Sequence, residues 1–308
     1  MRNRARADAR ELVVGWPDHE PSPGTHFWAD QVVAGLRANG VTVEPREIPQ
    51  LADTFVVLTE VSDGHSVHTV VFDPEDGPEL VSGLSDEVLV YFKLQYQDPG
   101  YGDPRVVPGG YLLANNIAYR YLPLVRALRN RRRFRYDVYG RFGLRYGGVE
   151  VRKRAVEILS ARSDFRFEGN LFKYPGGPEK VPYRQYLFEI ARAKVCVDMP
   201  GAGALCTRLI DYLAVGACVV GPRPAARLPV PLVDGTHVVH CADDLSDLGD
   251  ICAELVNDGA ERERIARNGR EYFDRHLNRR QLGSYYLTQM RSALHAMSSA
   301  DSSLASGG

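Results

Sequence analysis

The stretch "KVCVDMPGAGALCTRLIDYLAVGACVVGP", Lys194 to Pro222, contains a strand, a glycine-rich loop, a helix and a second strand in close succession. Apolar residues dominate 194–199 and 217–222, as in buried strands, and the residues between Thr207 and Val215 follow a helical pattern. Gly216 interrupts that pattern and lets the chain return to the sheet. A strand–helix–strand unit of this kind predicts an open, parallel α/β sheet.

The loop and the helix start in this stretch are suited to an anion. Ligands of open α/β sheets bind outside the carboxyl ends of the strands. Gly201 and Gly203 lie in the loop at that end, where glycine lets a ligand approach the backbone closely. The helix is expected to begin between Leu205 and Thr207, and its free N–H groups and positive dipole end favour negative charge. Arg208, in the first turn, adds donors suited to phosphate oxygens.

An acid follows on the same helix face, because Asp211 lies three residues after Arg208. A carboxylate would be repelled by phosphate but would pair well with two sugar hydroxyls. Phosphate and ribose side by side predict a nucleotide. The alternative is that the two residues form only an i,i+3 ion pair on a solvated helix face, and their spacing leaves both interpretations open.

The same alternation appears at the beginning of the chain. "LVVG" at 12–15 predicts a strand, a helix is expected from Thr25 to Ala38, and Asn39-Gly40 is typical of a helix end. A strand then follows, which completes a strand–helix–strand unit. Farther along, two strands are expected around a turn at Asp63-Gly64.

Helices and strands alternate again from Tyr136 onward, which predicts a second sheet. We therefore expect an α/β protein with two Rossmann-like domains facing a cleft and a C-terminal helix that crosses back to the first domain. The expected parts are a first, acceptor-side domain at 1–134, a second, ligand-binding domain at 135–278, a returning helix at 279–297 and a disordered tail at 298–308.

The segment "IDYLAVGACVV", Ile210 to Val220, resembles a stretch of GT-B fold glycosyltransferases of the group 1 type, in which an acid precedes Ala-x-Gly-x-x-Val-Val. The resemblance is closest to the spore-maturation-like glycosyltransferase branch. In such enzymes the acid, most often glutamate, holds the ribose of a nucleotide-sugar donor. The resemblance implies this role for Asp211, while Cys218 stands where proline is common.

Two further segments carry the resemblance, which extends from Tyr136 to Leu277. "DVYGRFG" resembles the strand and Gly-Arg turn that open the donor domain, where the arginine, here Arg141, reaches the donor diphosphate. "FRFEGNLFKYPGG" resembles the strand and loop that flank the nucleobase. The donor-binding residues implied by the whole segment are Arg141, Lys173, Tyr174, Gly201, Gly203, Thr207, Arg208 and Asp211.

The resemblance implies a hexosyltransferase-like enzyme that moves a sugar from a nucleotide-diphosphate sugar to a small-molecule or glycan acceptor. If the reaction inverts the anomeric centre, it needs a base near the acceptor hydroxyl. Asp18, His19 and His26 follow the first strand of the first domain and are the candidates, with histidine best matched to neutral pH. Each of them could instead be an ordinary loop or capping residue, and a retaining reaction needs no such base.

No metal is expected, because the donor-domain sequence has no Asp-x-Asp at a strand end of the kind that metal-dependent transferases use. Basic groups would then neutralise the leaving diphosphate. We expect no cofactor other than the nucleotide-diphosphate sugar as co-substrate. The five cysteines are odd in number and form no C-x-x-C pair, which favours reduced, mostly buried thiols.

Composition narrows the class of protein. A content of 44% hydrophobic and 25% charged residues with a formal net charge of -1 is typical of a globular protein and gives no sign of general nucleic-acid or membrane-surface binding. The basic cluster from Arg126 to Arg135 is interpreted as a solvated helix end. No apolar run approaches the ~20 residues of a membrane span, and the basic N-terminus lacks a signal-peptide core, so a cytoplasmic protein is expected.

Two other functions stay open. A non-catalytic nucleotide-sugar-binding or structural protein could use the same fold, and it would bind without turnover or not bind at all. A sugar-nucleotide epimerase or dehydrogenase is the other alternative. The loop "GWPDHEPSPG" after the first strand lacks the G-x-G-x-x-G fingerprint that would support it.

Overall fold

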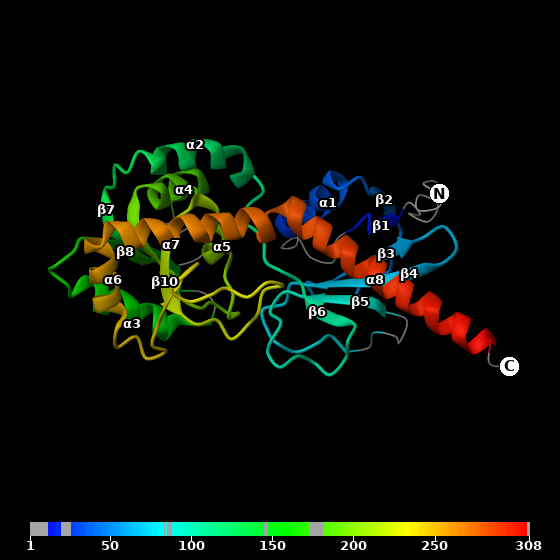
Figure 1. Ribbon diagram of the computed structural model, residues 1–308. Helices are drawn as coiled ribbons and strands as arrows, with labels where there is room; N and C mark the ends of the chain where they lie inside the picture. The colour runs from blue at the N-terminus through cyan, green and yellow to red at the C-terminus, as the bar shows by residue number, and fades with distance from the viewer. Residues whose placement is uncertain are drawn as a thin grey trace. The chain divides into compact units, whose positions relative to one another are not determined.

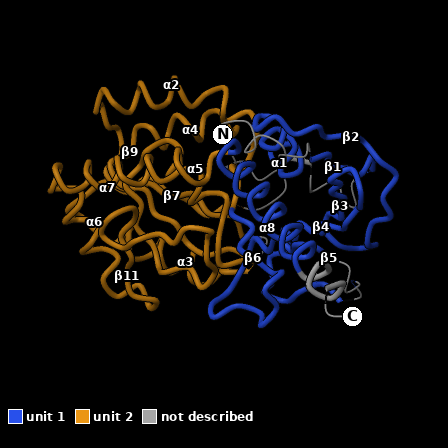
Figure 2. Tube along the Cα trace, turned by 45° about the vertical axis from the view of Figure 1, so that its right-hand side comes forward, with its two compact units in different colours: residues 1–110, 279–308 blue, residues 111–278 orange. Residues whose placement is uncertain are grey.

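The chain divides into two compact units, which Figure 2 shows in different colours. Unit 1 comprises residues 1–110 and 279–308, and unit 2 comprises 111–278. The computed structural model describes residues 12–19, 26–82, 84, 88–144, 147–172 and 181–306, with the backbone alone at 26–27 and 300–306. Each unit is built around one β-sheet with helices packed on it, so the α/β prediction is confirmed.

Unit 1 begins with the predicted strand–helix–strand unit. Strand β1 (Val13–Pro17) and strand β2 (Thr42–Arg46) are parallel, and helix α1 (His26–Ala38) connects them. Gly40 has a φ of 79°, a left-handed conformation that glycine adopts at little cost, and it ends the helix as expected.

The rest of this sheet contains the predicted hairpin. Strands β3 (Val57–Ser62) and β4 (Val67–Asp73) are antiparallel, and β5 (Val88–Lys93) and β6 (Val106–Pro108) continue the sheet as parallel strands. The order is β2-β1-β3-β4-β5-β6. Aromatic rings pack against one another on this sheet, with Phe72 of β4 and Phe92 of β5 stacked at a centroid distance of 4.9 Å.

Helix α8 (Arg279–Ser306) returns to unit 1, as predicted, and lies along α1 (Figure 1). The two helix backbones touch where glycines meet, since a Cβ on Gly283 would lie 2.3 Å from the backbone of Gly35. The expectation of a disordered tail from residue 298 is wrong, because α8 continues to Ser306. Residues 298–306 are mostly serine, a weaker helix former than alanine, but extending an existing helix avoids the cost of nucleation.

Unit 2 has a purely parallel sheet. Its strands are β7 (Tyr136–Gly143), β8 (Phe167–Phe172), β9 (Ala193–Val197), β10 (Cys218–Pro222) and β11 (Val239–Cys241), in the order β11-β10-β9-β7-β8. The order reverses between β7 and β9, and in open sheets the crevice at such a reversal is where ligands bind. The helices are α3 (Val149–Ser160), α4 (Tyr183–Ala191), α5 (Thr207–Val215), α6 (Leu248–Asn257), α7 (Gly259–Tyr272) and the π-helical turn η1 (Phe273–Leu277).

Helix α2 (Ala118–Asn130) belongs to unit 2, so the first boundary lies before this helix instead of after residue 134. Packing explains the difference, because α2 lies against α4 and α5. Arg129, expected on a solvated helix end, is buried and donates to the carbonyl of Ala193 at 2.6 Å. Arg131, Arg132 and Arg133 beyond it are exposed.

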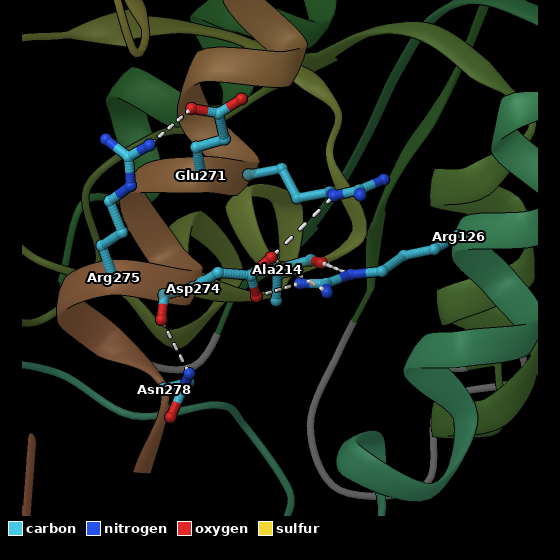
Figure 3. Close-up of polar contacts among 7 residues, drawn as sticks. Arg126, Ala214, Glu271, Asp274, Arg275 and Asn278 are labelled. Atoms are coloured by element: carbon cyan, nitrogen blue, oxygen red, sulfur yellow. Dashed lines mark hydrogen bonds and ion pairs between the residues drawn. The ribbon is translucent and has the colours of Figure 1, made fainter. Parts of the chain in front are cut away.

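A second arginine of α2 holds the end of α5. Figure 3 shows Arg126 reaching both Ala214, in the last turn of α5, and Asp274 of η1. Arg126 Nε donates to the Ala214 carbonyl at 2.7 Å, and its terminal nitrogens donate to both carboxylate oxygens of Asp274 at 2.8 and 3.2 Å. A cation at a helix C-terminus also meets the negative end of the helix dipole, so α5 is fixed at this end.

The five cysteines are free thiols. Four of them are buried, with Cys196 and Cys218 in the strands of the unit 2 core, as their apolar surroundings predicted. Only Cys206, directly before α5, is partly exposed. Within the described ranges, no helix combines the length and the apolar character that crossing a bilayer requires.

Candidate functional site

A cavity of about 430 Å³ lies in unit 2, where the carboxyl ends of β7 and β8 meet the start of α5. This volume is in the range of small-molecule sites. Four of the predicted donor-binding residues, Arg141, Thr207, Arg208 and Asp211, come together in its wall. The full lining is Ala114, Asn115, Arg141, Phe172, Val181, Tyr183, Tyr186, Thr207, Arg208 and Asp211.

The first turn of α5 forms one side of this cavity. Cys206, the residue before the helix, is extended and makes no side-chain capping bond, which leaves N–H groups of the first turn for another acceptor. Gly201 and Gly203 lie in the preceding loop, where the Gly201 N–H donates to the Gly203 carbonyl at 3.0 Å. They shape the approach to α5 and are not among the cavity's lining residues.

Arg208 is held in place by an acid that the sequence analysis did not select. Its Nε donates to Asp198 Oδ1 at 2.8 Å, and Nη2 donates to the Met199 carbonyl at 2.5 Å. The guanidinium also lies over the Phe142 ring, 4.9 Å from its centroid. The alternative interpretation, a surface ion pair between Arg208 and Asp211, is therefore wrong, because Arg208 pairs with Asp198 across the loop.

Arg141, near the end of β7, is likewise paired. Its Nε donates to Glu189 Oε2 at 2.8 Å, and the Tyr139 hydroxyl donates to the same oxygen at 2.8 Å. Burial alone would raise the pKa of Glu189, but the hydrogen bonds from Arg141, Gln185 and Tyr139 hold it below its ordinary value. Glu189 is thus ionised, and both arginines of the cavity have a carboxylate partner.

Asp211 is the most unusual group in the wall. Its side chain is buried, and Oδ1 accepts hydrogen bonds from the Tyr183 hydroxyl at 2.8 Å and from the Ala114 N–H at 3.2 Å. Oδ2 is buried without a hydrogen-bond partner. Burial raises the pKa of Asp211 to about 7, although Tyr183, Ala114 and Arg208 act in the opposite direction. A buried, unsatisfied carboxylate oxygen costs stability, which is typical of functional sites.

Tyrosine rings form the wall beside Asp211. Tyr183 and Tyr186 lie one turn apart on α4 with ring centroids 5.9 Å apart, and Tyr186 continues to Tyr139 at 6.4 Å and to Tyr212 at 6.3 Å. Burial raises the pKa of Tyr183 far above its ordinary value, with Asp211 adding to the shift. The Tyr183 hydroxyl is consequently a hydrogen-bond donor at any physiological pH.

Asp18 and His19 are not among the described lining residues of this cavity. Asp18 and His19 directly follow β1 in unit 1 and are exposed, and residue His26 begins α1. The side chain of His26, and all of Lys173 and Tyr174, lie outside the described residues. The roles of these five residues stay predictions.

Sequence reasoning missed Tyr183, Tyr186, Glu189 and Asp198. The spacing of the first three in "YRQYLFEIA", i, i+3 and i+6, places polar groups on neighbouring turns of one helix and was a usable signal. Asp198 directly follows a strand, which was also a signal. The sequence contained no such signal for the Ala114 N–H, because a backbone donor in a distant loop has no pattern in the sequence.

The described residues contain no cluster of three or more His, Cys, Asp or Glu side chains that could hold a metal ion. Independence from metal stays a prediction.

Comparison with known proteins supports a class for this site. Residues 122–285, more than half of the chain, match the family model described as glycosyl transferase-like. The protein therefore belongs to the glycosyl transferase-like family, and this membership supports a role in glycosyl transfer. The matched range contains every described lining residue of the cavity except Ala114 and Asn115.

One solved structure similar to this chain is the C-terminal domain of a glycosyl transferase group 1 family protein (LpcC) from Francisella tularensis. The two share 13% sequence identity over 53% of this chain and 94% of that chain, with a TM-score of 0.34. No curated protein matches the chain.

Proposed function

We propose that this protein is a glycosyltransferase that takes a sugar from a nucleotide-diphosphate sugar held in the unit 2 cavity. The observation that carries the proposal is Asp211, whose buried Oδ2 has no partner in the wall of a cavity at the start of a helix. A ribose hydroxyl is a donor that would satisfy this oxygen. We further propose that the protein belongs to the spore-maturation-like branch and that the sugar it transfers is a hexose.

The diphosphate belongs next to the first turn of α5 in this proposal. Thr207 and the uncapped N–H groups supply donors, and the positive end of the helix dipole favours the negative charge. Arg208 and Arg141 each use Nε on a carboxylate, and Arg208 Nη2 donates to the Met199 carbonyl. The remaining N–H groups of the two guanidinium groups are the donors that would reach the phosphate oxygens. Fixed positive groups of this kind stabilise a leaving diphosphate.

The acceptor, a small molecule or a glycan, is proposed to bind to unit 1. Asp18, His19 and His26 are the candidates for the base of an inverting reaction. No metal takes part in the proposed chemistry, and the nucleotide-diphosphate sugar is the only co-substrate. The proposed location is the cytoplasm.

The test is a titration of the purified full-length protein with UDP-, GDP- and TDP-sugars in the presence of a metal chelator. Calorimetry measures binding, and release of the nucleoside diphosphate measures turnover. One nucleotide class should bind, and Asp211→Ala and Arg208→Ala should each weaken it by about tenfold or more, as expected for loss of a charged hydrogen bond. Arg154→Ala, on the exposed side of α3, should bind like the unchanged protein.

Three results would contradict parts of the proposal. If no nucleotide sugar binds, the donor site is wrong. If a nucleotide sugar binds equally well to both variants, the site is elsewhere. Binding without turnover for any acceptor would instead favour the non-catalytic binding protein.

A further inference from the structure

The hydroxyl of Tyr183 has a defined place in the cavity. Tyr183 is the first residue of α4, and Asp211 lies on α5, so the 2.8 Å hydrogen bond between them joins two helices. The backbone of Asn115 acts against the rise in the pKa of Tyr183, but burial outweighs it. The Tyr183 hydroxyl therefore stays protonated and donates its hydrogen to Asp211.

The two carboxylate oxygens of Asp211 differ in their hydrogen bonds. Oδ1 has its acceptor sites taken by Tyr183 and by the Ala114 N–H, whereas Oδ2 has no partner. Since Asp211 is only 1% exposed, bulk water does not satisfy Oδ2. A proton on Asp211 would thus reside on Oδ2, and a ligand hydroxyl would need the same oxygen as its acceptor.

The groups around Asp211 leave Tyr183 as the side chain that bonds to it. Arg208 is on the same helix, but its Nε and Nη2 are directed to Asp198 and Met199. The titratable or charged side chains that face this carboxyl are Tyr183 and Tyr186 from α4, Arg208 from α5 and Arg141 from β7 across the cavity.

We propose that Tyr183 is a positioning residue, which holds Asp211 through Oδ1, favours its ionised form and reserves Oδ2 for a hydroxyl of the ligand. This inference rests on the proposed nucleotide-sugar site and adds a pH dependence to it. The hydrogen bond from Tyr183 lowers the pKa of Asp211, which burial raises to about 7. Without that bond the carboxyl would be protonated at neutral pH, and Oδ2 would present a hydrogen where the ligand presents one too.

A first experiment needs no ligand. The protein is labelled with 13C in the aspartate carboxyl groups, Asp211 is assigned by the loss of its signal in Asp211→Asn, and the signal is followed between pH 4.5 and 9.5. The unchanged protein should titrate near pH 7. Tyr183→Phe should raise this midpoint by about one pH unit, the worth of one hydrogen bond to a charged group. A midpoint below pH 5, or one that Tyr183→Phe leaves unchanged, overturns the proposal.

A second experiment follows the calorimetric affinity for UDP, GDP or TDP, whichever binds, across the same pH range. The affinity should rise with pH through the Asp211 midpoint. In Tyr183→Phe it should be roughly tenfold weaker at pH 6.5 and approach that of the unchanged protein above pH 9, because only the ionised fraction differs. An equal loss at every pH would mean that Tyr183 merely supports the fold. Failure of all three nucleotides to bind would contradict the proposed function, while the carboxyl titration still decides the role of Tyr183.

The matched control is Tyr272→Phe, which removes a hydroxyl that donates to the Val230 carbonyl elsewhere in unit 2. It should leave the Asp211 midpoint unchanged. If Tyr183→Phe does not fold, the unchanged protein labelled in the tyrosine 13Cζ positions is measured instead. The Tyr183 signal should then change at the same pH as the Asp211 carboxyl, and independent midpoints would overturn the proposal.

Discussion

Arg208 and Asp198 form an ion pair in which Nε and Oδ1 are 2.8 Å apart and the side chains are only 12% and 11% exposed. Burial alone would lower the pKa of Arg208, but Asp198 and its other neighbours raise it above its ordinary value, so the arginine stays charged. Burial raises the pKa of Asp198, and Arg208 opposes this shift. The pair joins the end of β9 to the first turn of α5 and so sets one edge of the cavity.

Asp198→Ala should destabilise the protein by about 3 kcal/mol, because it leaves a buried guanidinium without its counter-charge. The double variant Asp198→Leu/Arg208→Leu should lose less stability than the sum of the two single leucine variants, since removing both charges avoids the unpaired one. Urea unfolding of the unchanged protein, the two single leucine variants and the double variant measures this difference. If the losses in the free energy of unfolding simply add, the two charges are not coupled.

The raised pKa of Asp211 predicts a pH dependence of stability. Between its unfolded value of 3.8 and about 7, the folded protein keeps a proton that the unfolded chain releases. This group therefore makes the free energy of unfolding fall as pH rises through that window, by roughly 4 kcal/mol in total. This loss of stability is absent below pH 3.8 and complete above pH 7.

Asp211→Asn removes this titration and should unfold at higher urea concentration than the unchanged protein at pH 8. At pH 4 the two should be close in stability. Comparing the variant with the unchanged protein at each pH cancels the contributions of the other carboxylates. An advantage that is the same at both pH values would contradict the raised pKa. The variant should nevertheless fail to bind the nucleotide, because Asn presents an N–H or a neutral oxygen to the ligand.

Arg126 should matter more for stability than other arginines near η1. Arg126→Met removes the bond to the Ala214 carbonyl and both bonds to Asp274 seen in Figure 3, and we expect a loss of about 2 kcal/mol in the free energy of unfolding. Arg275→Met is the matched control. Its pair with Glu271 is exposed on both sides and should contribute less than about 1 kcal/mol. Equal losses would refute this ranking.

Local signals in the sequence predicted much of the fold but only part of the site. The strand–helix–strand pattern around Gly216 was readable because each element has its own periodicity and the glycine marks the end of the helix. The contacts of Asp211 were not readable, since Tyr183 and Ala114 lie 28 and 97 positions away and only the packing of α4 and the loop before α2 brings them together.

The arginines show the same limit. The place of Arg208 at a helix start predicted a ligand-facing arginine, and the family resemblance implied the same for Arg141. Both line the same cavity. Their pairing with Glu189 and Asp198 depends on distances across the sheet, which no spacing along the chain encodes. For Arg129, hydropathy predicted exposure, and the burial follows from carbonyls at the end of α4 and the start of β9 that need a donor.

Gly216 should resist substitution because of its backbone as well as its neighbours. It has a φ of 88°. The Ala217 N–H donates to the Tyr212 carbonyl at 2.9 Å and the Gly216 N–H to the Leu213 carbonyl at 3.0 Å, the bonds of a Schellman motif that ends α5. A Cβ here would lie 3.2 Å from Arg270 Cδ. Gly216→Ala should therefore cost about 1–2 kcal/mol in the free energy of unfolding.

Gly235→Ala separates the two causes of that cost. Gly235 also has a left-handed φ, 64°, but a Cβ there would meet no atom within 4 Å. The free energy of unfolding of Gly235→Ala should be lower by about 1 kcal/mol, and this difference should reflect backbone strain alone. Any larger loss in Gly216→Ala then measures the crowding against Arg270, and Gly216→Val should lose more again because its branched side chain meets the same neighbour. If Gly216→Ala were no less stable than the unchanged protein in urea unfolding, α5 would not depend on this glycine for its end.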